Sequence, residues 1–369
     1  MDKVKKLLLV NVPTGRCNFK CPYCFITQTD RWNEEGWTFE RTPEEVGRAF
    51  AMERFGGPCY VNLCSRGETL IYPQMVEITE QILKQGHYVE VVTNGSIPDR
   101  FEAISKFSKD LLERLSFKFS FHYTELKRLN KFDVFFDNIR LMRDAGASFT
   151  LELTPVDEEE QYIDEMKQLC MKELGAWCHC TIARDDRLKS IPVLSEHTLE
   201  EYCDIWSTFD SGMLKFKKSV FQERRNEFCY AGDWSAYINL FTGNMTKCYA
   251  SPIFGNIYDF DKPIAFEAIG TCPISHCYNA HALMTFGLLP DVDTITYDVI
   301  RNRTCEDGSE WLKPAVKAFF QSKLIESNEE YTEAQKAAAI KKTKRRTRRI
   351  KLSRAIKGPV KRIIKGISK

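Results

Sequence analysis

The sequence lacks any apolar segment long enough to cross a bilayer. Its first apolar run, Leu7 to Val10, follows Lys3, Lys5 and Lys6 and is too short for the hydrophobic core of a signal peptide. With 43% hydrophobic and 28% charged residues, the composition is that of an ordinary globular protein. We therefore expect a cytoplasmic protein.

The sequence also lacks the cysteine spacing of a small secreted disulfide scaffold. It contains 14 cysteines, which is many, but they are dispersed over 369 residues. Cysteines used in this way are typical of a reducing compartment in which thiolates bind metals.

A third absence concerns the first cysteine group, which has no fourth cysteine nearby. Cys17, Cys21 and Cys24 lie within eight residues, directly after the apolar run. Structural zinc sites take four ligands and iron–sulfur clusters usually take four thiolates, so three thiols leave one metal position open. The alternative is a structural metal knot or a set of core cysteines.

The spacing CxxxCxxC, with Tyr23 before the last cysteine, resembles the signature of the radical S-adenosylmethionine superfamily. The resemblance implies a 4Fe–4S cluster on Cys17, Cys21 and Cys24, with S-adenosylmethionine on the fourth iron. It also implies a 5′-deoxyadenosyl radical that abstracts hydrogen from a substrate, and an electron donor such as flavodoxin or ferredoxin.

Between Leu7 and Ile182, short β-like runs alternate with amphipathic stretches, which predicts βα units and a parallel sheet. Helices are expected after Thr42-Pro43 and Tyr72-Pro73. The resemblance implies that six such α/β units form a partial TIM-like barrel. We expect strands near 7–12, 59–64, 88–93, 115–121, 148–154 and 176–182, and further helices at about 99–112, 132–145 and 158–174.

Several polar residues occur in the expected strands or directly after them. Gly67-Glu68 partly matches the family's Gly-Gly-Glu motif for the methionine amino group, although Arg66 replaces the first glycine. A solvated turn is the alternative there. Glu152 lies within an apolar strand and must be paired or functional. By resemblance, the candidate cofactor-binding residues are Tyr23, Gly67, Glu68, Thr93, Asn94, Ser120 and Glu152.

A second cysteine region begins at Cys229. An alternating run from Ala236, a Thr242-Gly243-Asn244 turn and a return to Cys248 predict a hairpin. This pattern resembles the SPASM or twitch extension of radical S-adenosylmethionine enzymes. The resemblance implies an auxiliary 4Fe–4S cluster, while a zinc site on the same thiols remains open. The candidate ligands are Cys229, Cys248, Cys272 and Cys277.

The chain ends in a strongly basic segment. The formal net charge is +2, and residues 341–369 contribute 14 Lys or Arg and no acid, so residues 1–340 sum to −12. A basic amphipathic segment favours contact with an anionic membrane surface, with nucleic acid or a solvated tail as alternatives. We expect a barrel at 1–185, a helical linker at 186–225, a twitch-like domain at 226–300, a helical region at 301–340 and the tail at 341–369.

The resemblance implies an enzyme that oxidises or modifies a peptide side chain or a sugar-like alcohol. No catalytic base can be identified from the sequence. The alternatives are an RNA-modifying enzyme of the same superfamily and a zinc-binding module without enzymatic activity.

Overall fold

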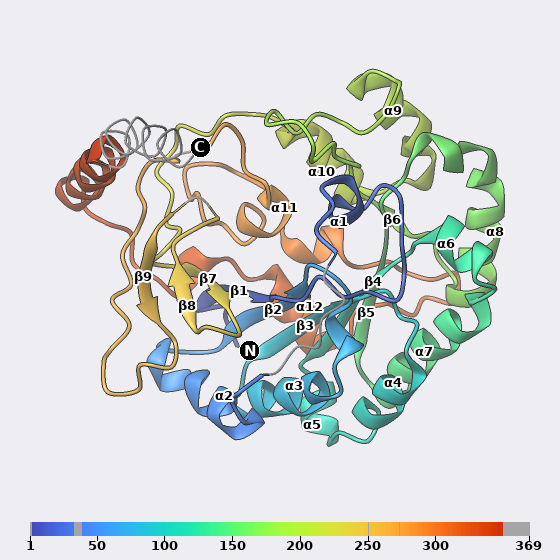
Figure 1. The fold of residues 1–369 in the computed structure, drawn as a ribbon, viewed down its shortest axis with the longest axis horizontal. Coiled ribbons are helices and arrows are strands. Elements are labelled where there is room, and N and C mark those ends of the chain that lie inside the picture. Colours follow the sequence, from blue (N-terminus) through green and yellow to red (C-terminus); the bar gives the residue numbers. More distant parts are fainter. Residues whose placement is uncertain (1, 33–38, 250, 273, 350–369) are drawn as a thin grey trace, which may run out of the picture.

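A nine-stranded sheet forms the centre of the protein (Figure 1). The computed structural model describes residues 2–32, 39–249, 251–272 and 274–349. The strand order is β6-β5-β4-β3-β2-β1-β7-β8-β9, and neighbours from β6 to β7 are parallel. The first six strands are β1 (Lys6–Val12), β2 (Cys59–Ser65), β3 (Tyr88–Thr93), β4 (Leu115–Ser120), β5 (Ser148–Leu153) and β6 (His179–Cys180). The predicted α/β alternation and parallel pairing are thus confirmed.

Helices connect these strands and begin and end where the local sequence dictates. Thr42 caps α2 in a capping box with Glu45, and Pro43 occupies its first turn. Gly146 ends α7 with a φ of 105°, a conformation that few other residues adopt. The helix expected at 99–112 is two helices instead, because the chain becomes extended at Ser108. The helices are α1 (Phe25–Gln28), α2 (Pro43–Ala49), α3 (Gln74–Lys84), α4 (Pro98–Ile104), α5 (Lys109–Leu112), α6 (Tyr123–Arg128), α7 (Phe132–Ala145) and α8 (Ile163–Leu174).

The two faces of the sheet pack against different parts of the chain. All seven residues of β1 are buried. Leu8 and Val10 belong to the cluster that includes the inner faces of α2 to α8, whereas Leu7 and Leu9 belong to a second cluster with residues from 213 to 339. Side chains alternate along a strand, so β1 joins both cores. Burial of each such Leu or Val contributes about 1.5–3 kcal/mol.

The predicted hairpin is present, and it extends the central sheet. β7 (Ser235–Asn239) pairs antiparallel with β8 (Asn244–Thr246), which pairs with β9 (Ile253–Asn256). Gly243, with a φ of 74°, completes the turn. On its other side β7 lies parallel to β1, with Leu7 opposite Ser235. The region expected as a separate small domain therefore shares its sheet with the first six strands.

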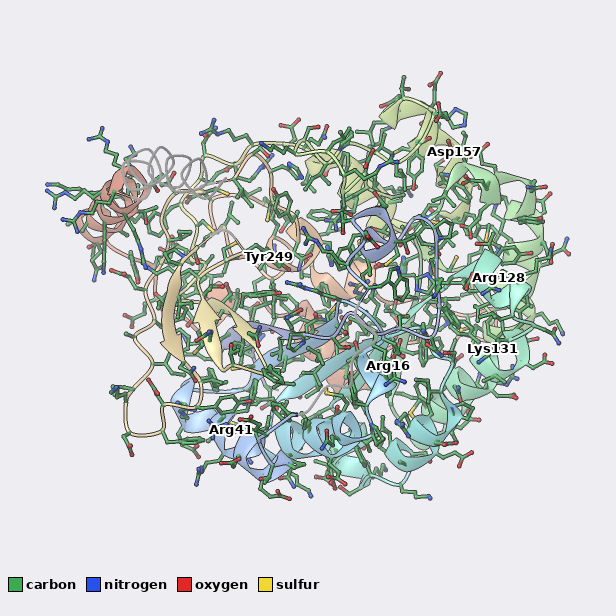
Figure 2. All side chains as sticks on the ribbon, viewed as in Figure 1. Arg16, Arg41, Arg128, Lys131, Asp157 and Tyr249 are labelled. Atoms are coloured by element: carbon green, nitrogen blue, oxygen red, sulfur yellow. The ribbon has the colours of Figure 1, made fainter. Side chains whose placement is uncertain are left out.

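The remaining helices follow β6 and cover the second face. They are α9 (Leu199–Trp206), α10 (Gly212–Val220), α11 (Ala280–Leu283) and α12 (Pro314–Gln321), and residues 333–349 are also helical. Many side chains of 333–349 end in nitrogen and point outward (Figure 2), while Lys342 and Thr343 contact Glu267 and the Ile269 carbonyl. None of the helices in the described residues combines the length and apolar content that a membrane crossing requires. Residues 350–369 of the predicted basic tail lie outside the described residues.

Candidate metal and cofactor site

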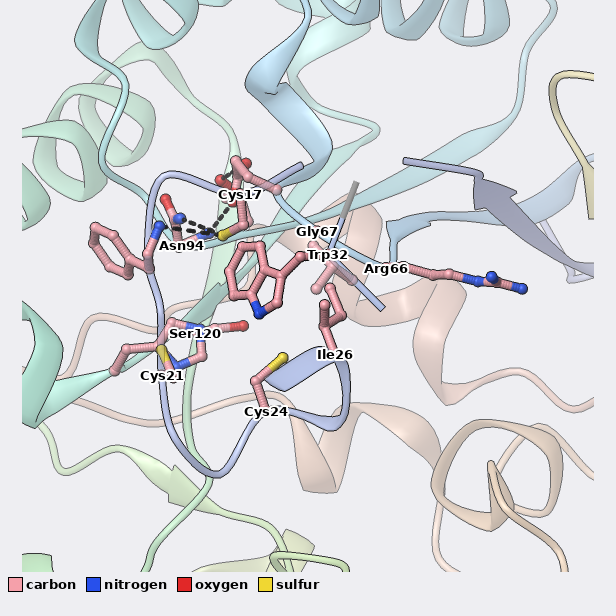
Figure 3. A pocket seen from close by; sticks show the side chains of 14 residues that line it. Cys17, Cys21, Cys24, Ile26, Trp32, Arg66, Gly67, Asn94 and Ser120 are labelled. Carbon is pink, nitrogen blue, oxygen red and sulfur yellow. Dashed lines mark hydrogen bonds between the residues drawn. The ribbon is translucent and has the colours of Figure 1, made fainter. Parts of the chain in front are cut away.

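The first three cysteines line one pocket at the carboxyl ends of the parallel strands. The loop that leaves β1 carries Cys17 and Cys21, and Cys24 precedes α1. The pocket holds about 460 Å³ of space, and in the view of Figure 3 the Trp32 ring lies between Cys17 and Cys24. Its lining is Cys17, Phe19, Cys21, Cys24, Ile26, Trp32, Arg66, Gly67, Glu68, Val92, Thr93, Asn94, Ser120 and His122.

The three thiols are chemically suited to a soft metal centre. Burial raises the pKa of Cys17 to about 12, and Glu68 adds to the shift. Burial also raises the pKa of Cys21 and Cys24. Such protonated thiols release their protons when they bind a metal ion, because the cation stabilises the thiolate. Three sulfur donors around one polar pocket therefore fit an iron–sulfur group with one iron left for a ligand.

Gly67 is required because two backbone segments meet there. Its N–H donates to the Thr14 carbonyl at 2.9 Å, and the Glu68 N–H donates to the Arg16 carbonyl at 3.0 Å. A Cβ at Gly67 would collide with that Arg16 carbonyl. Arg66 extends away from the thiols (Figure 3), so the position where the family has its first glycine tolerates a long side chain. The contact ties the end of β2 to the cysteine loop.

Glu68 is a buried carboxylate that joins two strand ends. One oxygen accepts from the Leu70 N–H at 2.9 Å and the Thr93 hydroxyl at 2.7 Å, and the other accepts from the Asn94 N–H at 2.7 Å. Burial raises the pKa of Glu68, and these three donors oppose the shift. The bonds to Thr93 and Asn94 hold the end of β3 in place. A carboxylate has about four acceptor positions, so Glu68 retains one for a further donor.

Asn94 continues this network to the cysteine loop. Its Nδ2 lies 2.8 Å from Asn18 Oδ1 and 3.7 Å from Cys17 Sγ (Figure 3). Its Oδ1 accepts from the Ser96 hydroxyl at 2.6 Å. The amide thus fixes the loop against the end of β3 and points one N–H at a candidate ligand sulfur.

Two of the sequence candidates do not line this pocket. The Tyr23 hydroxyl is 2.8 Å from His122 Nδ1, and its ring lines a neighbouring pocket. Glu152 lies 2.9 Å from Lys118 Nζ and 2.6 Å from an Arg301 guanidinium nitrogen. Burial alone would raise the pKa of Glu152, but these two cations hold it well below its usual range. The structure therefore gathers Gly67, Glu68, Thr93, Asn94 and Ser120 at the pocket and pairs Glu152 elsewhere.

Sequence reasoning missed two residues at this pocket. His122 follows a strand and carries no motif that distinguishes it from an ordinary turn histidine, yet it lines the pocket and contacts Tyr23. Burial lowers the pKa of His122 to about 4, and Lys118 adds to this, so the imidazole is neutral. Trp32 gave no signal, because it lies in a segment without periodic pattern.

The part of the chain that forms this pocket is similar to known proteins. Residues 11–170 match the model of the Radical SAM superfamily. This part of the chain is therefore similar to a radical SAM domain. A 7-carboxy-7-deazaguanine synthase of Haemophilus influenzae is 29% identical over 104 residues, 28% of this chain and 44% of that protein. An S-adenosyl-L-methionine-dependent tRNA 4-demethylwyosine synthase of Pyrococcus horikoshii is 34% identical over 58 residues, 16% of this chain and 17% of that protein.

A solved structure shares the fold over 70% of this chain. The tagged form of anSMEcpe with bound AdoMet superposes with a TM-score of 0.50 and 16% sequence identity, covering 70% of this chain and 76% of that one. The chain spans less than half the length of the curated relatives that it matches.

The second cysteine set lies outside the matched radical SAM residues. Cys229 pairs with Gly270 in an isolated bridge, Cys248 follows β8, and Cys277 directly precedes α11. Burial raises the pKa of Cys229 well above its usual value, and Cys248, Cys277 and Cys272 add to it, so four thiols from separate segments share one neighbourhood. Burial likewise raises the pKa of Cys277 to about 12.

In the described residues, the thiols of the second set are not gathered within the reach of one metal ion. A zinc ion with Zn–S bonds of about 2.3 Å holds its thiolates about 3.8 Å apart. Within the described part of the chain, no three of the candidate cysteines have all their sulfur atoms within 4.8 Å.

Another group that could bind a metal ion lies apart from the second cysteine set. Asp157, Glu160 and His197 have ligand atoms within 4.8 Å of one another, the only such group among the residues the structure describes. Glu160 is 2.9 Å from His197 Nε2. Figure 2 places Asp157 near α9 and Tyr249 near the hairpin, so this group is separate from the second cysteine set.

Proposed function

We propose that the protein is a radical S-adenosylmethionine enzyme with a 4Fe–4S cluster on Cys17, Cys21 and Cys24. The observation that carries the proposal is the placement of three thiols from one loop in a pocket with the polar ends of β2, β3 and β4. When bound, the cluster supplies the electron that cleaves S-adenosylmethionine to methionine and a 5′-deoxyadenosyl radical, which removes hydrogen from the substrate.

The surrounding residues orient the cofactor and protect it from water. Glu68 has one acceptor position left for the methionine ammonium, and the Gly67 backbone forms the adjoining wall of the pocket. Thr93, Asn94 and Ser120 present hydroxyl and amide groups for the ribose. Tyr23 acts through His122, and Glu152 through Lys118, which is two positions before Ser120 on β4.

A second 4Fe–4S cluster on Cys229, Cys248, Cys272 and Cys277 belongs to the same proposal. Four thiols complete the coordination of such a cluster, so this site binds no substrate through iron and serves to relay an electron. The mutual raising of the thiol pKa values supports it, because it shows that the four thiols share one neighbourhood. The region would then correspond to a twitch-like extension fused to the edge of the barrel sheet.

The proposed substrate is a peptide side chain or a sugar-like alcohol, with flavodoxin or ferredoxin as electron donor in the cytoplasm. We further propose that the basic tail contacts an anionic membrane surface. RNA modification is the second candidate, because one similar protein is a tRNA 4-demethylwyosine synthase and the tail is basic. That similarity extends over only 58 residues.

The test is metal and product analysis of anaerobically purified full-length protein. Two 4Fe–4S clusters require about eight irons per chain. After reduction with dithionite, S-adenosylmethionine should yield 5′-deoxyadenosine. Stoichiometric zinc without iron, or iron without product, would refute the proposal.

A further inference from the structure

Lys217 is a buried cation without a partner. It lies on α10, which packs against the region of α11, and only 8% of its surface is exposed. Among the described residues, its ammonium makes no hydrogen bond or ion pair. A buried ammonium is costly unless a negative group compensates it. Its surroundings should therefore contain an anion.

Glu152, the carboxylate that interacts with Lys217, cannot compensate its charge. Glu152 attracts Lys217, but its two oxygens already contact Lys118 at 2.9 Å and Arg301 at 2.6 Å. Arg184 and Arg301 both repel Lys217. The protein groups around Lys217 thus leave an excess of positive charge.

The same cation faces the second cysteine set. Lys217, Arg184 and His276 line one small pocket with Cys277, and no carboxylate is among the residues that line it. Lys217 and Cys277 each favour the charged form of the other. Gln28 of α1, which follows Cys24, donates to the carbonyl of Arg184 at 2.9 Å, so this pocket is linked to the first cysteine region through Arg184.

We propose that Lys217, supported by Arg184, provides the positive charge that compensates the anionic auxiliary cluster and raises its reduction potential. The inference rests on the second cluster of the proposed function. Reduction adds an electron to a group already surrounded by four thiolates, and a nearby cation stabilises the more negative state. Lys217 is thereby a positioning and tuning residue for electron transfer.

The protonation state of Lys217 agrees with this role. Its pKa is lowered to about 8, mainly by burial and also by Arg184, while Glu152 and Cys277 oppose the shift. A pKa near 8 leaves the side chain mostly charged at neutral pH, and thiolates bound to iron would hold it in that form.

The test is a potentiometric titration of the iron-loaded full-length protein, followed by electron paramagnetic resonance. The signal that does not respond to S-adenosylmethionine is assigned to the second cluster. Lys217→Met removes the charge and keeps an unbranched side chain, Lys217→Arg keeps the charge, and Lys215→Met removes an exposed charge from the same helix. We expect a lower midpoint potential in Lys217→Met, and wild-type values in the other two.

The outcomes separate the two proposals. An unchanged potential in Lys217→Met, with the second signal present, overturns the role of Lys217 and leaves the second cluster intact. Absence of a second signal in the wild-type protein overturns the auxiliary cluster itself, and the role of Lys217 with it. If Lys217→Met and Lys217→Gln lose the second cluster but Lys217→Arg retains it, the charge is needed for assembly, which supports the proposal.

Discussion

The two cysteine regions differ in how the chain builds them. Cys17, Cys21 and Cys24 come from one loop, and the ends of neighbouring strands supply the rest of their pocket. Cys229, Cys248, Cys272 and Cys277 come from separate segments spread over about 50 residues, with a cation facing one of them. The first set offers three sulfur donors beside polar groups, and the second offers four.

This difference implies different chemistry at the two sites. A cluster with three protein ligands has an iron that can bind a substrate, whereas four ligands restrict a cluster to electron transfer. Glu68 and Asn94 hold the first loop through hydrogen bonds and also line its pocket. A site that binds a further ligand needs such polar groups beside the metal. The following predictions test whether the two regions are open and closed in this sense.

The largest effect is expected from the first set. Replacing Cys17, Cys21 or Cys24 by Ala removes one iron ligand and so abolishes formation of 5′-deoxyadenosine under dithionite. Cys203→Ala, which removes a buried thiol of α9 outside both sets, is the control and should retain the activity. Undiminished cleavage in any of the three variants contradicts the assignment of the open site.

A smaller effect is expected at Glu68. In Glu68→Gln, one oxygen that now accepts from N–H or O–H donors becomes an NH₂ group, so at least one contact to Leu70, Thr93 or Asn94 is lost. A lost hydrogen bond to a charged group costs about 1.5–3 kcal/mol, which corresponds to about tenfold to a hundredfold. The substitution also removes the negative charge proposed to bind the methionine ammonium, so the KM for S-adenosylmethionine should rise by a factor in this range.

The matched control for this change is Glu77→Gln, which alters an exposed residue of α3. It should leave the KM unchanged. Equal KM values for Glu68→Gln and wild type would show that the Glu68 network does not shape the open site.

The smallest effect on chemistry is expected from the tail. Each Lys or Arg that reaches an anionic surface contributes about 1 kcal/mol, within a Debye length. A chain truncated after Ile340 should cleave S-adenosylmethionine normally but fail to float with anionic vesicles after nuclease treatment. If the full-length protein also fails to float with these vesicles, the tail has another role. If truncation abolishes cleavage of S-adenosylmethionine, the tail contributes to a metal site.

The sequence predicted the local features of the fold well. The five longer strands were placed within one residue at each end, because buried parallel strands are apolar runs bounded by turn residues. Thr42-Pro43 predicted the start of α2 for the same local reason. At Cys17 to Cys24, three candidate ligands lie within eight residues, so spacing alone suggested one site.

Long-range features could not be predicted in this way. The pairing of β7 with β1 joins residues more than 220 positions apart in the sequence. The sequence of neither strand indicates which strand it pairs with. The same holds for Arg301, which pairs with Glu152, and for the burial of Lys217 on a helix that had been expected as a linker. Such contacts depend on how distant segments pack against the second face of the sheet.

The most direct test of the open and closed sites uses one variant and one ligand. In the protein with Cys17, Cys21 and Cys24 all replaced by Ala, about four irons should remain, since the second set is complete by itself. We predict that S-adenosylmethionine changes the paramagnetic resonance spectrum of the reduced wild-type protein and leaves that of the triple variant unchanged. A triple variant that retains no iron although folded, or whose spectrum responds to S-adenosylmethionine, would contradict the account.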